Sequence, residues 1–338
     1  MLPTISLAPL AASGQHPDAR ATAEALTAAC HDPGFCYLTD HGVDARLEQR
    51  AQRVARDFFA LPRAAREAIA ISNSAHFRGY TLLGDEHTNG ASDYREQLDV
   101  GVEGVAQAPR ADEPPWQRLN GPNQWPSALP DMAPTVLEWM AAMQDVGLAV
   151  LRGLAVGLGQ RANRFDDYVT SEAHPKTKII RYPGRPATAP QTDPMQGVGL
   201  HHDSGLLTFI LQDEASGLEV HAADGNVIPV PPRPGTLVLN LGEMMQALSA
   251  DYLIATPHRV LVPPDGTERI SLAFFYNPRL DAVLEPVELP AELAARARPA
   301  PERSTQDPIH ASFGMNTLKI RLRAHPDVRE KFYADVNL

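Results

Sequence analysis

Residues 176–276 restrict the fold of this chain most strongly, because they divide into short strand-like runs separated by turns. The runs are rich in Val, Ile, Leu and Phe, and Asp224-Gly225 stands between two of them as a hairpin signal. Seven or eight strands at this spacing favour a sandwich or a jelly roll. The predicted strands cover residues 176–182, 206–212, 218–221, 226–230, 236–241, 257–262 and 269–276.

Helices are predicted on both sides of this β-rich part. The clearest spans residues 134–158, where apolar residues such as Met140 and Met143 recur at helical spacing and form a core-facing stripe. We therefore predict an α+β chain with a mainly β core. Its predicted regions are a helical and loop region at 1–172, a jelly-roll core at 173–284 and a helical region at 285–338.

Residues 73–125 lack clear periodicity and are polar and rich in Gly and Pro, so they are interpreted as a long ordered loop region. This region contains Arg78, Tyr80 and Arg95, which are either substrate contacts or, as the favoured interpretation, solvated side chains. Near the C-terminus, basic residues that alternate with apolar ones are also expected to form a solvated face. These are Lys319, Arg321 and Arg323.

The charge balance excludes some partners. Thirty Lys and Arg against 41 Asp and Glu give a net charge of −11, whereas nucleic acids and anionic membranes require basic patches. No uninterrupted apolar run reaches the roughly 18 residues of a membrane span. The chain has two cysteines, Cys30 and Cys36, too few for a disulfide framework. We therefore expect a soluble protein of the reducing cytoplasm.

A candidate metal site lies in the β-rich part. Residues two apart on an extended chain point to the same side, so His201 and Asp203 can converge on one ion while His202 points away. His258 follows His201 by 57 residues, in a predicted strand that can return beside this pair. Two imidazoles and one carboxylate on one face form the triad typical of non-haem Fe(II) oxygenases, which leaves coordination positions open.

Arg269 and Ser271 form a second pair on one face of a predicted strand. A guanidinium group and a hydroxyl are well suited to binding a carboxylate through two hydrogen bonds. In a mostly apolar barrel the charge of Arg269 is costly to bury unless a carboxylate neutralises it.

None of these motifs is specific by itself. His-x-Asp also occurs at residues 16–18 and 325–327. A turn aspartate beside a surface histidine, a core histidine at position 258 and a structural ion pair at Arg269 are therefore alternatives. The order of the motifs and their β context favour a site.

Three longer segments carry a resemblance to a known family, namely GVGLHHDSGLLTFILQDEASGLEV, LVLNLGEMMQALS and TPHRVLVPPDGTERISLAFFYNP. With LPTISLAPL and DPGFCYLTDHGVD near the N-terminus, they resemble the isopenicillin-N-synthase-like family of Fe(II)/2-oxoglutarate oxygenases. The resemblance covers most of the chain and implies a distorted double-stranded β-helix. It implies iron on His201, Asp203 and His258, and a 2-oxoglutarate whose far carboxylate lies on Arg269 and Ser271.

One further residue carries the resemblance. Tyr182, in Arg181-Tyr182-Pro183, resembles the family's tyrosine before a proline, which implies a hydrogen bond to the co-substrate or the substrate. Arg181 stands where plant members usually have Tyr, so the chain resembles the bacterial and isopenicillin branch more closely.

The resemblance implies an Fe(II)- and 2-oxoglutarate-dependent oxygenase that uses O2 and releases succinate and CO2. It would hydroxylate, desaturate or cyclise a small molecule. One alternative is a 2-oxoglutarate-independent Fe(II) oxidase of the isopenicillin N synthase type, which holds its own substrate's carboxylate on Arg269 and Ser271. Another is a non-catalytic protein that binds a small molecule on the same barrel. The sequence determines neither the substrate nor the oligomeric state.

Overall fold

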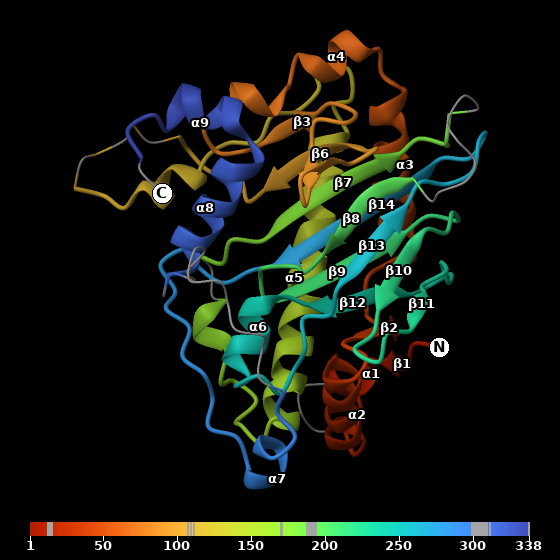
Figure 1. The fold of residues 1–338 in the computed structure, drawn as a ribbon, viewed down its shortest axis with the longest axis vertical. Helices are drawn as coiled ribbons and strands as arrows, with labels where there is room; N and C mark the ends of the chain where they lie inside the picture. Colours follow the sequence, from red (N-terminus) through yellow and green to blue (C-terminus); the bar gives the residue numbers. More distant parts are fainter. Residues whose placement is uncertain are drawn as a thin grey trace.

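Two β-sheets packed face to face form the centre of the molecule (Figure 1). The computed structural model describes residues 1–11, 16–106, 108, 110, 112–169, 172–186, 195–298, 310 and 312–336. The eight-stranded sheet has the order β1-β2-β12-β9-β14-β7-β6-β3, and the four-stranded sheet has the order β11-β10-β13-β8. This architecture is a distorted double-stranded β-helix, as predicted.

The strands of the large sheet are β1 (Thr4–Ser6), β2 (Phe35–Thr39), β12 (Leu237–Leu241), β9 (Leu207–Gln212), β14 (Arg269–Tyr276), β7 (Lys176–Tyr182), β6 (Glu96–Gly101) and β3 (Gly79–Thr81). Those of the small sheet are β11 (Val227–Pro229), β10 (Leu218–His221), β13 (His258–Leu261) and β8 (Gln196–His201). A separate hairpin joins β4 (His87–Thr88) and β5 (Ala91–Ser92). The predicted runs therefore all contain strands, whereas β8 was not among them.

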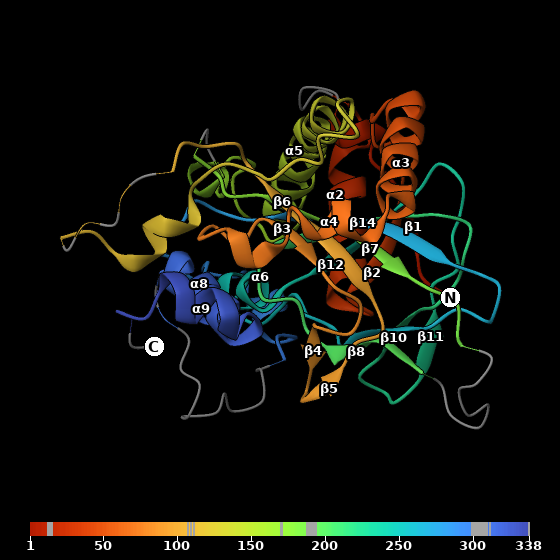
Figure 2. The same cartoon turned by 90° about the horizontal axis from the view of Figure 1, so that it is seen from above.

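Alternation along the strands of the large sheet separates two apolar cores. On β14, Ile270, Leu272 and Phe274 belong to the larger core, which the helices cover. Ala273, on the opposite face, belongs to the smaller core between the sheets, together with Val260 of β13. Figure 2 shows this layering, with α2, α3 and α5 on one side of the large sheet and the small sheet on the other.

The α-helices are α1 (Ala8–Ala11), α2 (Ala19–His31), α3 (Ala45–Ala60), α4 (Arg63–Glu67), α5 (Met132–Gly157), α6 (Glu243–Leu248), α7 (Ala291–Ala294), α8 (Phe313–Ala324) and α9 (Pro326–Phe332). Short 3-10 helices span Ile71–Asn73, Pro115–Leu119 and Asp166–Tyr168. The larger core takes residues from all three predicted regions, whose boundaries stay a prediction.

Helix α5 is the one helix in the described part of the chain that is long and apolar enough to cross a membrane, judged by length and composition alone. A search for uninterrupted apolar runs does not find it, because Glu138, Asp145 and Arg152 interrupt it. Met140 and Met143 are buried, as predicted, and the helix packs against α2, α3 and β14. It is thus the central helix of the larger core.

The expectation of a loop region at residues 73–125 is wrong in its centre, since β3 and β6 extend the large sheet there. Strand β6 carries Glu96, Gln97 and Asp99, and all three are buried. Charged residues normally indicate exposure. Here they are paired with cations from distant segments, which the local sequence does not reveal.

Burial overturns the expectation of solvated side chains for five residues, whereas Arg323 is exposed, as expected. Arg78, Tyr80 and Arg95 are all buried, as are Lys319 and Arg321 of α8.

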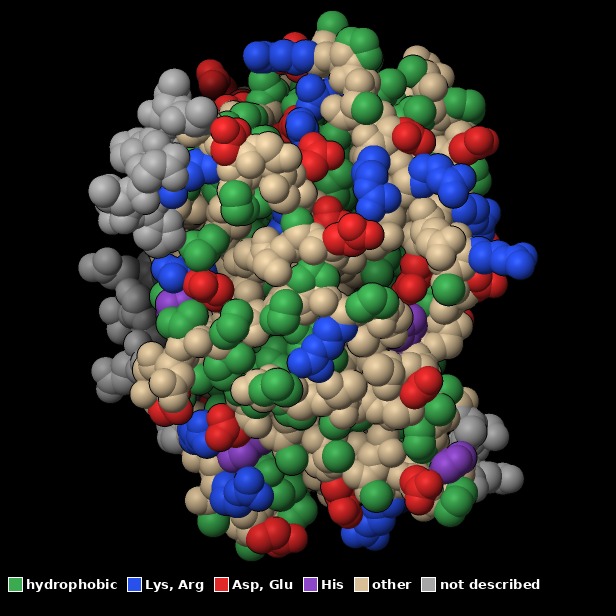
Figure 3. Space-filling view, turned by 90° about the vertical axis from the view of Figure 1, so that its right-hand side faces the viewer, with side chains coloured by type: hydrophobic (Ala, Val, Ile, Leu, Met, Phe, Trp, Pro, Cys, Tyr) green, Lys and Arg blue, Asp and Glu red, His purple; other side chains and the backbone are tan. Residues whose placement is uncertain are grey.

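On the face of the molecule in Figure 3, acidic and basic side chains are interspersed, and neither sign forms one continuous patch.

Candidate metal centre and cavity

The structure brings His201, Asp203 and His258 together. One potential ligand atom from each residue lies within 4.8 Å of the other two, and among the described residues this is the one cluster of that kind. His201 Nε2 is 3.7 Å from Asp203 Oδ1, and His258 Nε2 is 3.9 Å from Asp203 Oδ2. The adjacent His202 is exposed and does not belong to the cluster.

Antiparallel pairing of two strands places the histidines. His201 ends β8 and His258 begins β13, and the two residues are direct partners in the register. Asp203 follows β8 and forms a bridge with Gly242. The return of the His258 strand beside the His-x-Asp pair, inferred from order alone, is thus confirmed.

Backbone carbonyls fix the orientation of both imidazoles. His201 Nδ1 lies 2.9 Å from the carbonyl oxygen of Gly199, and His258 Nδ1 lies 3.0 Å from that of Thr256. A carbonyl only accepts hydrogen bonds, so each Nδ1 carries the hydrogen. The lone pair is therefore on each Nε2, which faces the cluster, as metal-binding histidines require.

The carboxylate is held just as firmly. Asp203 Oδ2 accepts hydrogen bonds from Thr208 Oγ1 at 2.6 Å and from Asn240 Nδ2 at 2.7 Å. Burial by itself raises the pKa of Asp203, but its interactions with His201 and His258 outweigh burial and hold the pKa well below the ordinary value. Asp203 is thus ionised at neutral pH.

Burial lowers the pKa of His258 to about 4, and the neighbouring His201 acts in the same direction. The ring is therefore neutral at physiological pH. A neutral imidazole and an ionised carboxylate are the protonation states that a divalent metal needs. The residues thus fit an Fe(II) ion in the arrangement of two histidines and one carboxylate.

Arg269 and Ser271 lie on β14 and face the same cavity as the triad. The guanidinium of Arg269 is 1% exposed and donates to Ser271 Oγ at 3.1 Å and to Gln212 Oε1 at 2.9 Å. Its Nε has no hydrogen-bond partner, and no carboxylate among the described residues forms an ion pair with it. A buried cation without a directly paired carboxylate fits a carboxylate ligand.

Tyr182 is the strand partner of Arg269, and its ring centroid lies 5.1 Å from the guanidinium carbon. The residue is 2% exposed and lines the cavity. It therefore packs beneath Arg269, and its proposed hydrogen bond to a ligand stays a prediction.

The cavity between the sheets has a volume of about 350 Å³. Its middle is apolar, with Ile180, Val198 and Ile210 among its lining residues. The metal cluster and Arg269 both open into it, which is the arrangement needed to hold a metal and a carboxylate ligand side by side.

Sequence reasoning missed two cations of this cavity, Lys176 and Lys178, expected Arg321 to be solvated, and named Arg95 only as the less favoured alternative of a substrate contact. Lys176, Lys178, Arg95 and Arg321 all line the cavity. A signal was present, because Lys176 and Lys178 lie two residues apart on the same face of β7 as Ile180 and Tyr182.

A double-stranded β-helix with a two-histidine, one-carboxylate cluster beside a buried arginine defines the class of Fe(II)/2-oxo acid oxygenases. Comparison with known protein families supports the same class. Residues 2–128 match the N-terminal region of the non-haem dioxygenases in morphine synthesis, and residues 176–278 match the 2OG-Fe(II) oxygenase superfamily.

Relatives span nearly the same length. The chain is 33% identical over 311 residues to the 2-oxoglutarate-dependent dioxygenase frbJ of Dothideomycetidae sp., covering 88% of this chain and 83% of the relative. It is 32% identical over 265 residues to a homoarginine-6-hydroxylase of Arabidopsis thaliana, covering 78% of this chain and 79% of the relative.

Solved structures are similar as well. A 2OG-Fe(II) oxygenase family protein of Caulobacter crescentus has a TM-score of 0.74 at 27% identity, with 95% and 98% of the two chains covered. A full-length Neurospora crassa protein, solved in complex with alpha-KG and thymine, has a TM-score of 0.73 at 25% identity, with 88% and 92% covered.

The chain belongs to the 2OG-Fe(II) oxygenase superfamily. It is a non-haem Fe(II)/2-oxoglutarate-dependent dioxygenase that uses Fe(II), 2-oxoglutarate and O2 and acts on a small-molecule substrate.

Proposed function

We propose that His201, Asp203 and His258 hold the iron, that Arg269 and Ser271 hold the far carboxylate of 2-oxoglutarate, and that the chain hydroxylates its substrate. One observation carries this proposal. The cavity that holds three converging ligand atoms also holds a buried guanidinium without a carboxylate partner among the described residues. A 2-oxo acid that binds the metal at one end and Arg269 at the other would satisfy both groups.

The chain's own residues position the reactants. His201 and His258 present their Nε2 atoms because Gly199 and Thr256 hold the Nδ1 hydrogens. The bound metal supplies the oxygen chemistry that breaks a substrate C–H bond.

The remaining residues hold the co-substrate. Arg269 and Ser271 fix the far end of the 2-oxo acid through charge-assisted hydrogen bonds, which directs its other end toward the triad. We assign to the Tyr182 hydroxyl a hydrogen bond to the co-substrate or the substrate. Ile180 and Val198 keep the middle of the cavity dry.

Hydroxylation is favoured over desaturation or ring closure because relatives at 29–32% identity are named homoarginine-6-hydroxylases. We also propose a cytoplasmic location. Both cysteines, Cys30 and Cys36, are free and buried, which suits a reducing compartment.

Enzyme assays test the function. The purified chain, loaded with Fe(II), is expected to convert 2-oxoglutarate to succinate with matching O2 uptake, faster when a substrate is present. Homoarginine and thymine are suitable first probes, and His258→Ala is the inactive control. Oxygen uptake without succinate would show the oxidase instead, and metal binding without any turnover would show a binding protein.

A further inference from the structure

The cavity has a second cationic end, far from Arg269. Arg269, Ser271, Ala273 and Phe275 alternate along one face of β14 and all line the cavity. Arg269 pairs with Tyr182 and Phe275 pairs with Lys176. Six residues of strand correspond to about 20 Å. Lys176 is therefore too far along the sheet to share a ligand carboxylate with Arg269.

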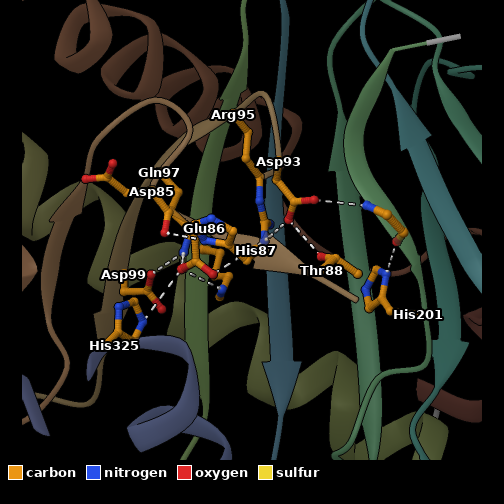
Figure 4. Close-up of polar contacts among 12 residues, drawn as sticks. Asp85, Glu86, His87, Thr88, Asp93, Arg95, Gln97, Asp99, His201 and His325 are labelled. Atoms are coloured by element: carbon orange, nitrogen blue, oxygen red, sulfur yellow. Dashed lines mark hydrogen bonds and ion pairs between the residues drawn. The ribbon is translucent and has the colours of Figure 1, made fainter. Parts of the chain in front are cut away.

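The polar network around this end pairs three of its four cations directly with carboxylates. Arg321 pairs with Asp99 at 2.7 Å, and Lys178 lies 3.8 Å from Glu86. Arg95 lies 3.2 Å from Asp93 and 3.7 Å from Glu86. Figure 4 shows Glu86, Asp93, Arg95 and Asp99 gathered in this network.

Lys176 is the cation left over. Among the described residues no carboxylate lies within 4 Å of its Nζ, which instead lies over the ring of Phe275, 4.7 Å from the ring centroid. Asp99, the acidic residue nearest along the sheet, is already paired with Arg321. Arg95, Lys178 and Arg321 thus each have a carboxylate within 4 Å, whereas Lys176 has none among the described residues.

Lys176 is half-buried, and a charge without a paired carboxylate is unfavourable in such a position. Desolvation lowers the pKa of Lys176 well below its ordinary value, and Arg321 and Lys178 lower it further, which outweighs the opposite effect of Asp99 and Asp203. A bound anion would restore the balance and favour the charged ammonium.

The surroundings fit an organic anion. Helix α8 presents Phe313, Thr317 and Arg321 to the cavity at helical spacing, and Asn277 and Phe275 line it from the sheet side. Aromatic surface for a carbon skeleton therefore lies beside donors for a charged head.

We propose that this end of the cavity binds the substrate through a carboxylate, with the Lys176 ammonium as the primary contact and the Arg321 guanidinium as the second. The substrate class is then a small organic acid whose carboxylate lies at the end of the cavity away from 2-oxoglutarate. This inference rests on the proposed function, because it assigns the rest of the cavity to the metal and the co-substrate.

Acetate and acetamide are matched probes for this site, since they differ in charge but hardly in shape. Calorimetric titrations use the full chain loaded with Mn(II) and saturating 2-oxoglutarate under nitrogen, so that Arg269 is already occupied. Acetate is expected to bind saturably and acetamide is not. Lys176→Met is expected to weaken acetate binding at least tenfold, whereas Lys331→Met, which removes an exposed lysine, leaves it unchanged.

Bromide soaks of the same complex locate the site without any variant. An anomalous peak beside Lys176 Nζ is expected. Equal acetate affinity in the wild type and Lys176→Met, equal binding of acetate and acetamide, or no peak at this end would overturn the inference.

The two proposals can fail separately. The affinity for 2-oxoglutarate in Lys176→Met is expected to match that of the wild type, and its loss would assign Lys176 to the co-substrate and overturn the inference. Failure of the wild type to bind 2-oxoglutarate would instead count against the proposed function.

Discussion

Asp93 is connected to the imidazole of His201 through two hydrogen bonds, both made by the backbone of Gly199. Its Oδ1 accepts from the backbone N–H of Gly199 at 3.1 Å, and the Gly199 carbonyl lies 2.9 Å from His201 Nδ1 (Figure 4). Asp93 is fully buried and is itself held by Thr88 and Arg95. A residue of the N-terminal part thus positions a proposed metal ligand in the β-rich part.

Asp93→Ala is expected to weaken metal binding about tenfold, because groups behind metal ligands typically contribute roughly 10- to 100-fold. Loss of the carboxylate frees Gly199 and with it the ring of His201. Titration of the apoprotein with Mn(II) measures the change. Binding of 2-oxoglutarate at Arg269 serves as a check on folding, and an unaltered metal affinity would count against a positioning role.

His201→Ala and His258→Ala are each expected to abolish iron binding while the fold survives. Each removes one of three ligand atoms, and neither residue supplies the apolar core of the sheets. Metal content after reconstitution and far-UV circular dichroism together measure this. His202→Ala is the matched control, since His202 lies outside the cluster. Normal turnover in either triad variant would remove the metal assignment.

Arg269→Ala is expected to raise the KM for 2-oxoglutarate about 10- to 100-fold, since charge-assisted hydrogen bonds contribute about 1.5–3 kcal/mol. Ser271→Ala, which removes only a neutral hydroxyl, is expected to have a smaller effect of about 3- to 10-fold. Steady-state succinate release at varied 2-oxoglutarate measures both. If KM stays constant in Arg269→Ala, the co-substrate binds elsewhere.

Glu48 is expected to make folding stability depend on pH. It is buried near the start of α3, its Oε1 has no hydrogen-bond partner, and burial raises its pKa to about 7. His41 Nε2 lies 3.6 Å away, but burial lowers the pKa of His41, so that ring offers little positive charge. The folded state therefore binds a proton that the unfolded state releases from about pH 4.5 upward.

Stability contributed by this proton is present at pH 4 and is lost as the pH rises through about 7. Glu48→Gln removes the dependence and is expected to be more stable than the wild type at pH 8 by about 1–2 kcal/mol, after allowance for solvent screening. Urea unfolding at pH 5 and pH 8 measures the difference. Glu24→Gln, on the exposed face of α2, is the control. If the free energy of unfolding depends on pH in the same way in the wild type and in Glu48→Gln, Glu48 is not the source of the dependence.

The sequence predicted the features that depend on local pattern. The bounds of β7, β10 and β14 agree with the predicted runs, and α5 covers nearly all of its predicted range. The His-x-Asp and Arg-x-Ser pairs were recognisable because alternation along a strand places residues two apart on one face. Order along the chain then sufficed to associate His258 with them.

The buried polar network was not predictable in this way. Asp99 looks like a loop residue until β6 pairs with β7 and α8 brings Arg321 to 2.7 Å. Whether a charged side chain is solvated or buried depends on a partner that is more than 200 residues away in this case. Local hydropathy contains no information about such a partner.

The sequence by itself therefore predicted most strands of the core, the central helix and the residues proposed as metal and carboxylate ligands. Only the tertiary structure decided which further cations line the cavity and which of them lacks a partner among the described residues. The physical reason is that strand formation and side-chain alternation are local, whereas the compensation of a buried charge requires groups that the fold brings together from distant segments.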